Sequence, residues 1–239
     1  MSDSAAPAIV IVDYGMGNLF SVLRACQSVG VEAVITDSKQ AVSDAAAVIL
    51  PGVGAFGVAM ENLAALDLID VLRDVAATGK PLLGVCLGMQ LLMSESHEFG
   101  HHRGLDIIPG NVVQLPLIPG LGAASKVPHV GWESVEPPVS SREGHAPGSA
   151  WDGTLLEGLP GGEYMYFVHS FYCRPRDQAR VLSVTRYGTF EFCSAVTLGN
   201  VMGCQFHPER SGPAGLLIYR NFSAKVASLK QGEQRAGQA

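Results

Sequence analysis

The sequence predicts an α/β protein whose central sheet is doubly wound and mostly parallel, with helices on both faces and additional antiparallel strands in the C-terminal half. Short apolar runs alternate with helical segments in the first half, whereas strand-like runs follow one another closely in the second. The length of 239 residues, with 47% hydrophobic and 16% charged side chains, suits one well-cored domain. We therefore expect a single domain over residues 1–239, with its core at about 8–228 and a disordered tail at 229–239.

The first half of the chain alternates strands with helices. Residues 8–12 are a continuous apolar run, which is typical of a parallel strand buried on both faces. Asn18 is a suitable N-cap for a helix that continues to about Val29 and stops at Gly30. Further strands are predicted at 31–35, 47–50 and 81–85, and further helices at 55–66, 68–77 and 87–96.

The second half changes character. Strand-like segments lie at 112–115, 130–135, 163–168, 179–186, 191–197 and 201–206. Gly188-Thr189 and Gly199-Asn200 have the composition of hairpin turns. A stretch rich in Pro, Gly and Ser predicts an exposed loop at 137–153, and a last helix is expected at 215–229.

Composition and charge argue against several classes of protein. The net charge is −6 and basic residues form no run, so we expect no nucleic-acid binding. No stretch approaches the ~20 apolar residues of a membrane span, and residues 1–7 lack the features of a secretory signal. The five cysteines are scattered, and none lies in a C-x-x-C pair. This pattern suits a reducing cytoplasm better than disulfides or a zinc site, so we expect no metal.

The most informative local feature is Cys86. A short apolar run leads into the cysteine, Gly84 and Gly88 lie two residues to either side, and a helix is predicted to follow. This is the G-x-nucleophile-x-G elbow, with Cys in place of Ser. Small residues let the neighbouring backbones pass, and a helix N-terminus favours the thiolate. The segment therefore predicts a nucleophile at a turn between a strand and a helix.

A cysteine nucleophile needs a base and a group that orients the base. His207 follows the apolar run at 201–206, and Glu209 comes two residues later. Residues i and i+2 of an extended segment point to the same side, so His207 and Glu209 can lie together. One interpretation is a triad of Cys86, His207 and Glu209; the other is an ordinary turn and a buried core thiol, and spacing alone leaves the two near even. The position of both features at strand ends, where α/β sheets bind ligands, favours the triad.

An acyl-transfer site also needs hydrogen-bond donors for a negatively charged oxygen. Gly52 and Val53 follow another predicted strand end, so their backbone N–H groups are candidates, together with that of Leu87. In isolation, the P-G-V-G sequence fits an ordinary tight turn better. Residues 13–18 do not complete a dinucleotide fingerprint, because Phe20 occupies the third glycine position. No phosphate-binding loop motif occurs either, so we expect no cofactor.

Six segments together resemble the class I glutamine amidotransferases. They are D-Y-G-M-G-N (13–18), L-P-G-V-G-A-F (50–56), G-V-C-L-G-M-Q-L-L (84–92), P-H-V-G-W (128–132), Y-F-V-H-S-F-Y (166–172) and F-H-P-E-R-S-G (206–212). The resemblance spans about residues 9–222. The elbow and H-P-E mark the whole family, whereas D-Y-G-M-G-N, H-V-G-W and F-V-H-S-F are similar to the branch that acts in histidine biosynthesis.

The resemblance implies an activity and a site. In the family, the cysteine thiolate attacks the side-chain amide of glutamine, and the histidine protonates the departing ammonia and then activates water. The glutamate orients the histidine, so these roles fall to Cys86, His207 and Glu209. The resemblance places the ends of the substrate glutamine at Gln90 and Glu98, in a pocket completed by His169, Ser170 and Phe171.

The resemblance also implies a partner. In the family, ammonia passes to a (β/α)8 cyclase subunit, which makes imidazole glycerol phosphate and aminoimidazole carboxamide ribotide. No such barrel is present in this sequence, so we expect it on a separate chain, with the two forming a heterodimer. Asn18, Trp132 and Arg210 match family positions at that interface. Glu133 stands where Asn is usual, Arg210 where Lys is usual, and the 137–153 loop is longer than is typical.

Two alternatives stay open at this point. The glutaminase of another synthase, such as pyridoxal phosphate synthase, would share the elbow and H-P-E, although H-V-G-W argues against it. A non-catalytic binding subunit on the same fold would not need an intact triad. We also expect low glutaminase activity in the isolated chain, because the glycine-rich turn at Gly52 and Val53 needs the partner to orient its N–H groups.

Overall fold

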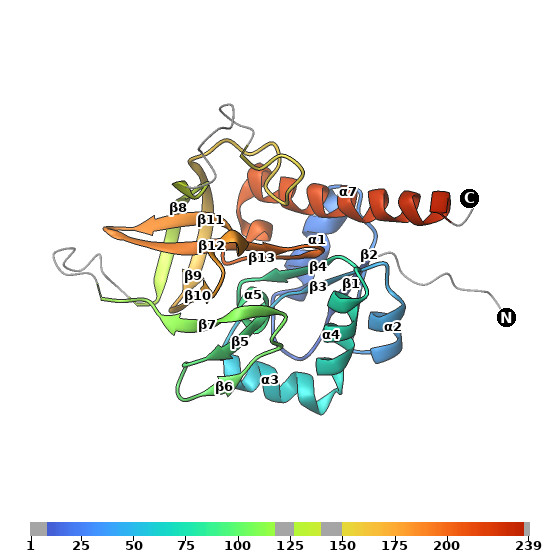
Figure 1. The fold of residues 1–239 in the computed structure, drawn as a ribbon, viewed down its shortest axis with the longest axis horizontal. Coiled ribbons are helices and arrows are strands. Elements are labelled where there is room, and N and C mark those ends of the chain that lie inside the picture. The colour runs from blue at the N-terminus through green and yellow to red at the C-terminus, as the bar shows by residue number, and fades with distance from the viewer. Residues whose placement is uncertain (1–8, 118–126, 140–149, 237–239) are drawn as a thin grey trace.

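The computed structural model describes residues 9–117, 127–139 and 150–236. Its main element is a nine-stranded sheet in the order β2-β1-β3-β4-β13-β12-β11-β8-β9 (Figure 1). Five neighbouring strands are parallel: β2 (Ala33–Thr36), β1 (Ile9–Val12), β3 (Ala47–Leu50), β4 (Leu82–Val85) and β13 (Val201–Cys204). The other four continue the sheet in antiparallel fashion: β12 (Phe190–Leu198), β11 (Val181–Tyr187), β8 (His129–Glu136) and β9 (Glu163–His169).

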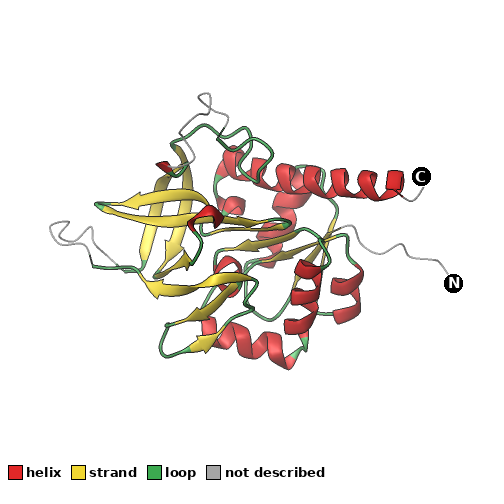
Figure 2. Cartoon of the chain, viewed as in Figure 1, coloured by secondary structure: helices red, strands yellow, loops and turns green. Residues whose placement is uncertain are grey.

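Helices cover both faces of the parallel strands (Figure 2). Helices α1 (Leu19–Ser28) and α7 (Gly212–Ala236) pack together on one face. The opposite face carries α2 (Lys39–Asp44), α3 (Phe56–Ala65) and α4 (Leu68–Ala77). Because both faces are covered, every residue of β1, β3 and β4 is buried, which explains their uninterrupted apolar sequences.

A second sheet of four strands lies beside the antiparallel part of the first. Its order is β10 (Phe171–Pro175), β7 (Ile108–Gln114), β5 (Met93–Ser96) and β6 (His102–Arg103). The chain leaves the first sheet at His169, the last residue of β9, and enters the second at Phe171. The short helices are α5 (Leu87–Leu91), η2 (Gln178–Arg180) and η3 (Pro208–Arg210).

The predicted fold class is confirmed, but several elements differ from the sequence-based prediction. The helix predicted at 87–96 is wrong beyond Leu91, because residues from Met93 onward form β5. Met93 pairs with Ile108 in parallel register, so pairing within the second sheet overrides the helical pattern. The sequence did not indicate α2, β6 or β10. Helix α2 begins after Ser38, whose side chain accepts a hydrogen bond from the Ala41 N–H.

The C-terminal helix is longer than predicted. Helix α7 continues to Ala236, so residues 229–236 are helical rather than a disordered tail. The rest of that predicted tail, at 237–239, and residues 140–149 of the predicted loop lie outside the described residues. Among the described residues, none of the helices combines the length and the apolar sequence needed to cross a bilayer.

Candidate active site

Three neighbouring parallel strands deliver the predicted reactive groups to one edge of the sheet. Cys86 follows β4, Gly52 lies two residues after β3, and His207 lies three residues after β13. Strand β4 pairs with β3 on one side and with β13 on the other. The carboxyl ends of parallel strands meet at the same edge, so all three groups surround one crevice.

Cys86 has a strained backbone. Its φ of 55° and ψ of −112° place it in a region that L-residues rarely adopt, between β4 and α5. The Cys86 N–H donates to the Cys204 carbonyl over 2.8 Å, which anchors the turn to β13. Its glycine neighbours leave no room for a side chain, because a Cβ on Gly88 would lie 1.7 Å from the carbonyl oxygen of Leu50. Cys86 therefore lies on a tight turn whose shape depends on glycine.

His207 is held by Glu209. The Nδ1 atom of His207 lies 2.8 Å from Oε1 of Glu209, and the Tyr219 hydroxyl donates to Oε2 of the same carboxylate over 3.4 Å. Burial lowers the pKa of His207, but Cys86 and Glu209 outweigh it and raise this pKa to about 10. The imidazole is therefore protonated at neutral pH. Its Nε2 atom is buried and, among the described residues, has no hydrogen-bond partner of normal geometry, although Cys86 is near enough to raise the pKa.

A cavity of about 230 Å³ opens beside the sulfur of Cys86. Besides Cys86, seven residues predicted from the sequence line it: Val53, Leu87, Gln90, Glu98, His169, Ser170 and Phe171. Three further residues complete the lining, namely Gly54, Pro128 and Val168. The seven residues were predicted from the sequence although Val53 and Phe171 are far apart in the chain. The crossing of the chain between the two sheets brings His169, Ser170 and Phe171 to this cavity.

Two side chains that line the cavity, Gln90 and Glu98, carry oxygen acceptors. The side-chain nitrogen of Gln90 donates to the Phe171 carbonyl over 2.9 Å and to Oε1 of Gln205 over 3.0 Å. Both its N–H groups are therefore used, which leaves the amide oxygen of Gln90 to face a ligand. Glu98 accepts a hydrogen bond from the Phe56 N–H over 2.5 Å. An amide oxygen and a carboxylate together suit a positively charged amine.

One predicted oxyanion donor, the backbone N–H of Leu87, is not free. The Leu87 N–H donates to the carbonyl oxygen of Gly52 over 3.3 Å, so an acceptor occupies the donor expected behind the nucleophile. Gly52 is tightly confined, because a Cβ there would lie 2.2 Å from the Tyr14 hydroxyl. That hydroxyl donates to the Pro51 carbonyl over 2.7 Å. The next residue, Val53, is 43% exposed and borders the cavity.

The predicted interface residues lie on or near the outer side of this crevice. Trp132 on β8 is 50% exposed and packs edge-on against the ring of Tyr166. The guanidinium of Arg210 lies 4.6 Å from the centre of the same ring. Asn18 precedes α1, which packs against η3, but its side chain makes no capping hydrogen bond. Glu133 differs from these residues because it contacts His129 inside the fold, at 3.3 Å.

Sequence reasoning missed two residues of the site. The side-chain nitrogen of Gln205 lies 3.7 Å from the sulfur of Cys86, and His129 contacts His169 behind the cavity. A signal existed for Gln205, because it is a polar residue at the end of an otherwise apolar buried strand. His129 stood inside the P-H-V-G-W motif, but nothing in the sequence indicated what it touches.

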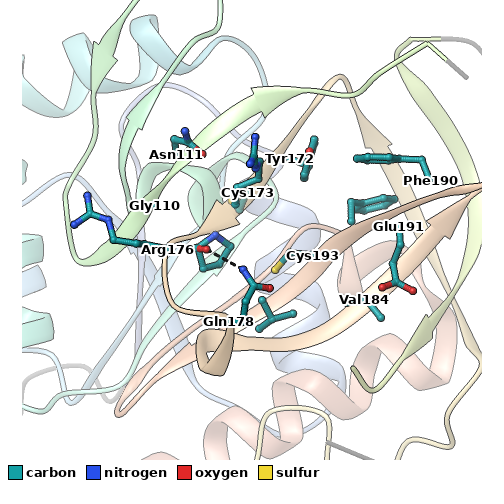
Figure 3. A pocket seen from close by; sticks show the side chains of 14 residues that line it. Gly110, Asn111, Tyr172, Cys173, Arg176, Gln178, Val184, Phe190, Glu191 and Cys193 are labelled. Carbon is teal, nitrogen blue, oxygen red and sulfur yellow. Dashed lines mark hydrogen bonds between the residues drawn. The ribbon is translucent and has the colours of Figure 1, made fainter. Parts of the chain in front are cut away.

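A larger cavity, of about 600 Å³, lies between β7, β10, β11 and β12 (Figure 3). Arg174, Arg176 and Glu191 border it, and the buried thiols of Cys173 and Cys193 form part of its wall. Burial raises the pKa of both thiols, to about 12 for Cys193, which makes them poor nucleophiles. This cavity shares no lining residue with the one at Cys86, and the reactive groups are at the smaller one.

Comparison with known sequences identifies relatives along the whole described fold. The sequence matches the family described as Glutamine amidotransferase class-I over residues 10–226. The Imidazole glycerol phosphate synthase subunit HisH of Aquifex aeolicus (strain VF5) is 43% identical over 224 residues, which cover 92% of this chain and 98% of the relative. The protein of the same name from Moorella thermoacetica (strain ATCC 39073 / JCM 9320) is 46% identical over 218 residues, 91% of this chain and 95% of the relative.

Solved structures share the fold at lower identity. A crystal structure of a glutamine amidotransferase has a TM-score of 0.66 and 21% identity, covering 91% of this chain and 98% of that chain. The glutaminase domain of Trypanosoma brucei CTPS with bound acivicin has a TM-score of 0.59 and 19% identity, covering 92% and 93%. From the family match and these relatives, the chain belongs to the class I glutamine amidotransferases.

Proposed function

We propose that this chain hydrolyses glutamine to glutamate and ammonia and passes the ammonia to a separate (β/α)8 cyclase subunit in histidine biosynthesis. One observation carries the proposal: Cys86, His207 and Glu209 lie at the carboxyl ends of adjacent parallel strands, beside a cavity with acceptors for an amine. The relatives that are 43% and 46% identical are named as subunits of imidazole glycerol phosphate synthase, which supports the same assignment.

The reaction follows from the protonation of His207. Cys86 reacts as the thiolate, whose sulfur bonds to the amide carbon of glutamine while Nε2 of His207 gives its proton to the departing nitrogen. Ammonia leaves and a γ-glutamyl thioester remains on Cys86. Water then loses a proton to Nε2 and bonds through its oxygen to the carbonyl carbon, and glutamate and the thiolate are released. Glu209 keeps Nδ1 protonated and stabilises the imidazolium at both stages.

Glutamine recognition relies on the two acceptors of the cavity. The α-ammonium group of glutamine would bind the amide oxygen of Gln90 and the carboxylate of Glu98, both of which line the cavity. His169, Ser170 and Phe171 complete the lining of the cavity. This arrangement leaves the side-chain amide of the substrate at the sulfur of Cys86.

The isolated chain should be a poor glutaminase. The carbonyl of Gly52 accepts from the Leu87 N–H, so the peptide between Gly52 and Val53 must turn before two N–H groups can face the oxyanion. The cyclase would favour the turned form, in which the Val53 N–H replaces the Gly52 carbonyl. Loss of one oxyanion donor typically lowers kcat by about 10²–10³-fold, so activation by the partner should be of this order.

The cyclase would bind the face that carries Trp132 and Arg210, with Asn18 at its margin. Trp and Arg commonly anchor interfaces because they bury a large area and retain polar contacts. Two further exposed apolar side chains, Val130 and Tyr164, lie on the same pair of strands, β8 and β9. We place the assembled heterodimer in the cytoplasm, where five buried free thiols are compatible with the redox conditions.

The test is glutamine hydrolysis with and without a cyclase subunit and its ligand. Cys86→Ala should abolish hydrolysis in the complex while circular dichroism and the melting temperature stay close to those of the wild type. Turnover that survives in Cys86→Ala would refute the proposed nucleophile. Equal turnover with and without the cyclase would refute the activation step. Co-purification with the synthase of another pathway would reassign the partner.

A further inference from the structure

A line of buried polar groups runs from β8 to the wall of the glutamine cavity. Oε1 of Glu133 lies 3.3 Å from Nε2 of His129, and Nδ1 of His129 lies 3.4 Å from Nε2 of His169. Nδ1 of His169 lies 2.9 Å from the Phe171 carbonyl oxygen. We refer to Glu133, His129, His169 and the Phe171 carbonyl as the histidine chain. Both histidines are buried, whereas the side chain of Glu133 is 31% exposed.

The last acceptor fixes the direction of the hydrogen bonds. A carbonyl oxygen can only accept, so Nδ1 of His169 must carry a proton. Burial lowers the pKa of His169 to about 3, so the ring is neutral and its Nε2 is an acceptor. The contact between the two rings then requires a proton on Nδ1 of His129.

The first link of the histidine chain therefore lacks a donor unless an additional proton is present. Burial lowers the pKa of His129 to about 4, so a neutral His129 protonated at Nδ1 presents a bare Nε2 to Glu133. An ionised carboxylate would place two acceptors 3.3 Å apart. Burial also raises the pKa of Glu133, which favours the carboxylic acid. A proton held between Glu133 and His129 satisfies all three contacts.

The histidine chain continues to the nucleophile. The Phe171 carbonyl that accepts from His169 also accepts from Gln90, and Gln90 donates to Gln205. The amide nitrogen of Gln205 lies 3.7 Å from the sulfur of Cys86. The position of one peptide carbonyl therefore couples the two histidines to the amide groups around the reacting atoms.

We propose that Glu133 is a positioning residue for the glutamine pocket. It shares a proton with His129, and this proton fixes the direction of the hydrogen bonds from His129 through His169 to the Phe171 carbonyl. The inference rests on the proposed glutaminase function. When the shared proton is lost, His129 donates from Nε2 to the Glu133 carboxylate, because a charge-assisted hydrogen bond is the stronger one. Nδ1 of His129 is then bare and faces the bare Nε2 of His169, so the contact between the rings is lost.

Two other titratable groups, Tyr187 and His207, lie near the histidine chain. Tyr187 of β11 packs against His129 with ring centres 4.2 Å apart, whereas the cross-strand neighbour of Glu133 on β9 is the uncharged Met165. His207 lies beyond His169 and lowers its pKa further, which opposes a positive charge on that ring. A proton gained by the histidine chain is therefore stabilised at the Glu133 end.

The test separates the histidine chain from catalysis. Nitrogen-15 NMR of histidine-labelled full-length protein, assigned with single His→Gln variants, reports which ring nitrogen carries a proton. As the pH rises, His129 of the wild type should switch from the Nδ1–H form to the Nε2–H form. Glu133→Gln should keep the Nδ1–H form throughout, because an amide donates to Nε2 of His129 without titrating. Glu191→Gln, an exposed change on β12, should switch like the wild type.

Kinetics of the complex with the cyclase test the consequence. The KM for glutamine in the wild type should rise about fivefold across the switch, as expected from the loss of one hydrogen bond, whereas that of Glu133→Gln should stay level. Identical KM profiles in the two proteins, or an Nε2–H form of His129 at the acid end, would overturn the proposal. A wild-type complex without glutaminase activity would instead refute the proposed function. The NMR result would still show whether Glu133 and His129 share a proton.

Discussion

Nδ1 of His207 lies 2.8 Å from the carboxylate of Glu209, and solvent reaches 4% and 1% of the two side chains. A buried carboxylate that binds one ring nitrogen fixes the tautomer of the histidine and directs the other nitrogen toward Cys86. Because the residues are only two positions apart, their geometry depends on Pro208, which begins η3 between them. The pair is therefore a preformed unit rather than one assembled by the substrate.

Glu209→Gln should lower the glutaminase kcat of the complex by roughly a hundredfold or more, because an amide neither stabilises the imidazolium nor fixes one tautomer. The KM for glutamine should change little, since Glu209 does not line the cavity. Steady-state kinetics with the cyclase present is the measurement. A variant with wild-type kcat would show that the carboxylate has no catalytic part.

The same pair should contribute a pH-dependent part of the stability. The pKa of His207 is about 10 in the folded chain and about 6.5 in an unfolded one, so its contribution is complete below about pH 6.5 and disappears as the pH rises through about 10. Wild type should therefore be more stable than Glu209→Gln near pH 6.5, and the difference should shrink toward pH 10. Urea unfolding of both proteins across this range checks it. A constant difference would contradict the raised pKa.

Gly88→Ala should destabilise the fold by about 3 kcal/mol or more, because the added Cβ would lie 1.7 Å from the Leu50 carbonyl oxygen. Gly131→Ala is the control, since the nearest atom to its Cβ is 3.9 Å away, and it should cost less than about 1 kcal/mol. Thermal unfolding of the two variants measures the difference. Equal melting temperatures would mean that the elbow can relax.

Trp132→Ala should weaken binding of the cyclase roughly thirtyfold, the effect of removing an interface anchor worth about 2 kcal/mol. The fold should be unaffected, because half of this side chain is exposed. Leu117→Ala, which removes another exposed apolar side chain outside the proposed interface, should bind normally. Isothermal titration calorimetry provides both constants. Similar affinity for the two variants would place the partner on another face.

The sequence was sufficient to predict the parallel core and the two strand ends that carry Cys86 and His207. Strands such as β1 and β4 are buried on both faces, so their sequences are unbroken apolar runs. Such runs can be recognised from the sequence of the segment alone. The strain at Cys86 requires Gly84 and Gly88, and this requirement is also visible in sequence. The buried strands and the turn at Cys86 can therefore be predicted, because the residues that determine their shape lie within or next to each segment.

Features that depend on distant partners were not predictable. Residues after Leu91 continue a helical pattern, yet pairing with β7 makes them a strand. The occupied Leu87 N–H depends on how two loops from different strands meet. Glu133 stands next to the predicted interface residue Trp132, yet in the fold its carboxylate lies 3.3 Å from the buried His129. The first two outcomes are decided by residues far apart in the chain, which one sequence does not pair.

The hydrogen bond between the Leu87 N–H and the Gly52 carbonyl suggests a way to label selectively those molecules in which this bond is broken. A glutamine-derived chloromethyl ketone builds negative charge on oxygen when a thiolate attacks it, so it should modify Cys86 mainly when the donor is released. Iodoacetamide develops no such charge and should modify both forms. The ratio of the two labelling rates would then count, in a mixed population, the molecules that have engaged their partner.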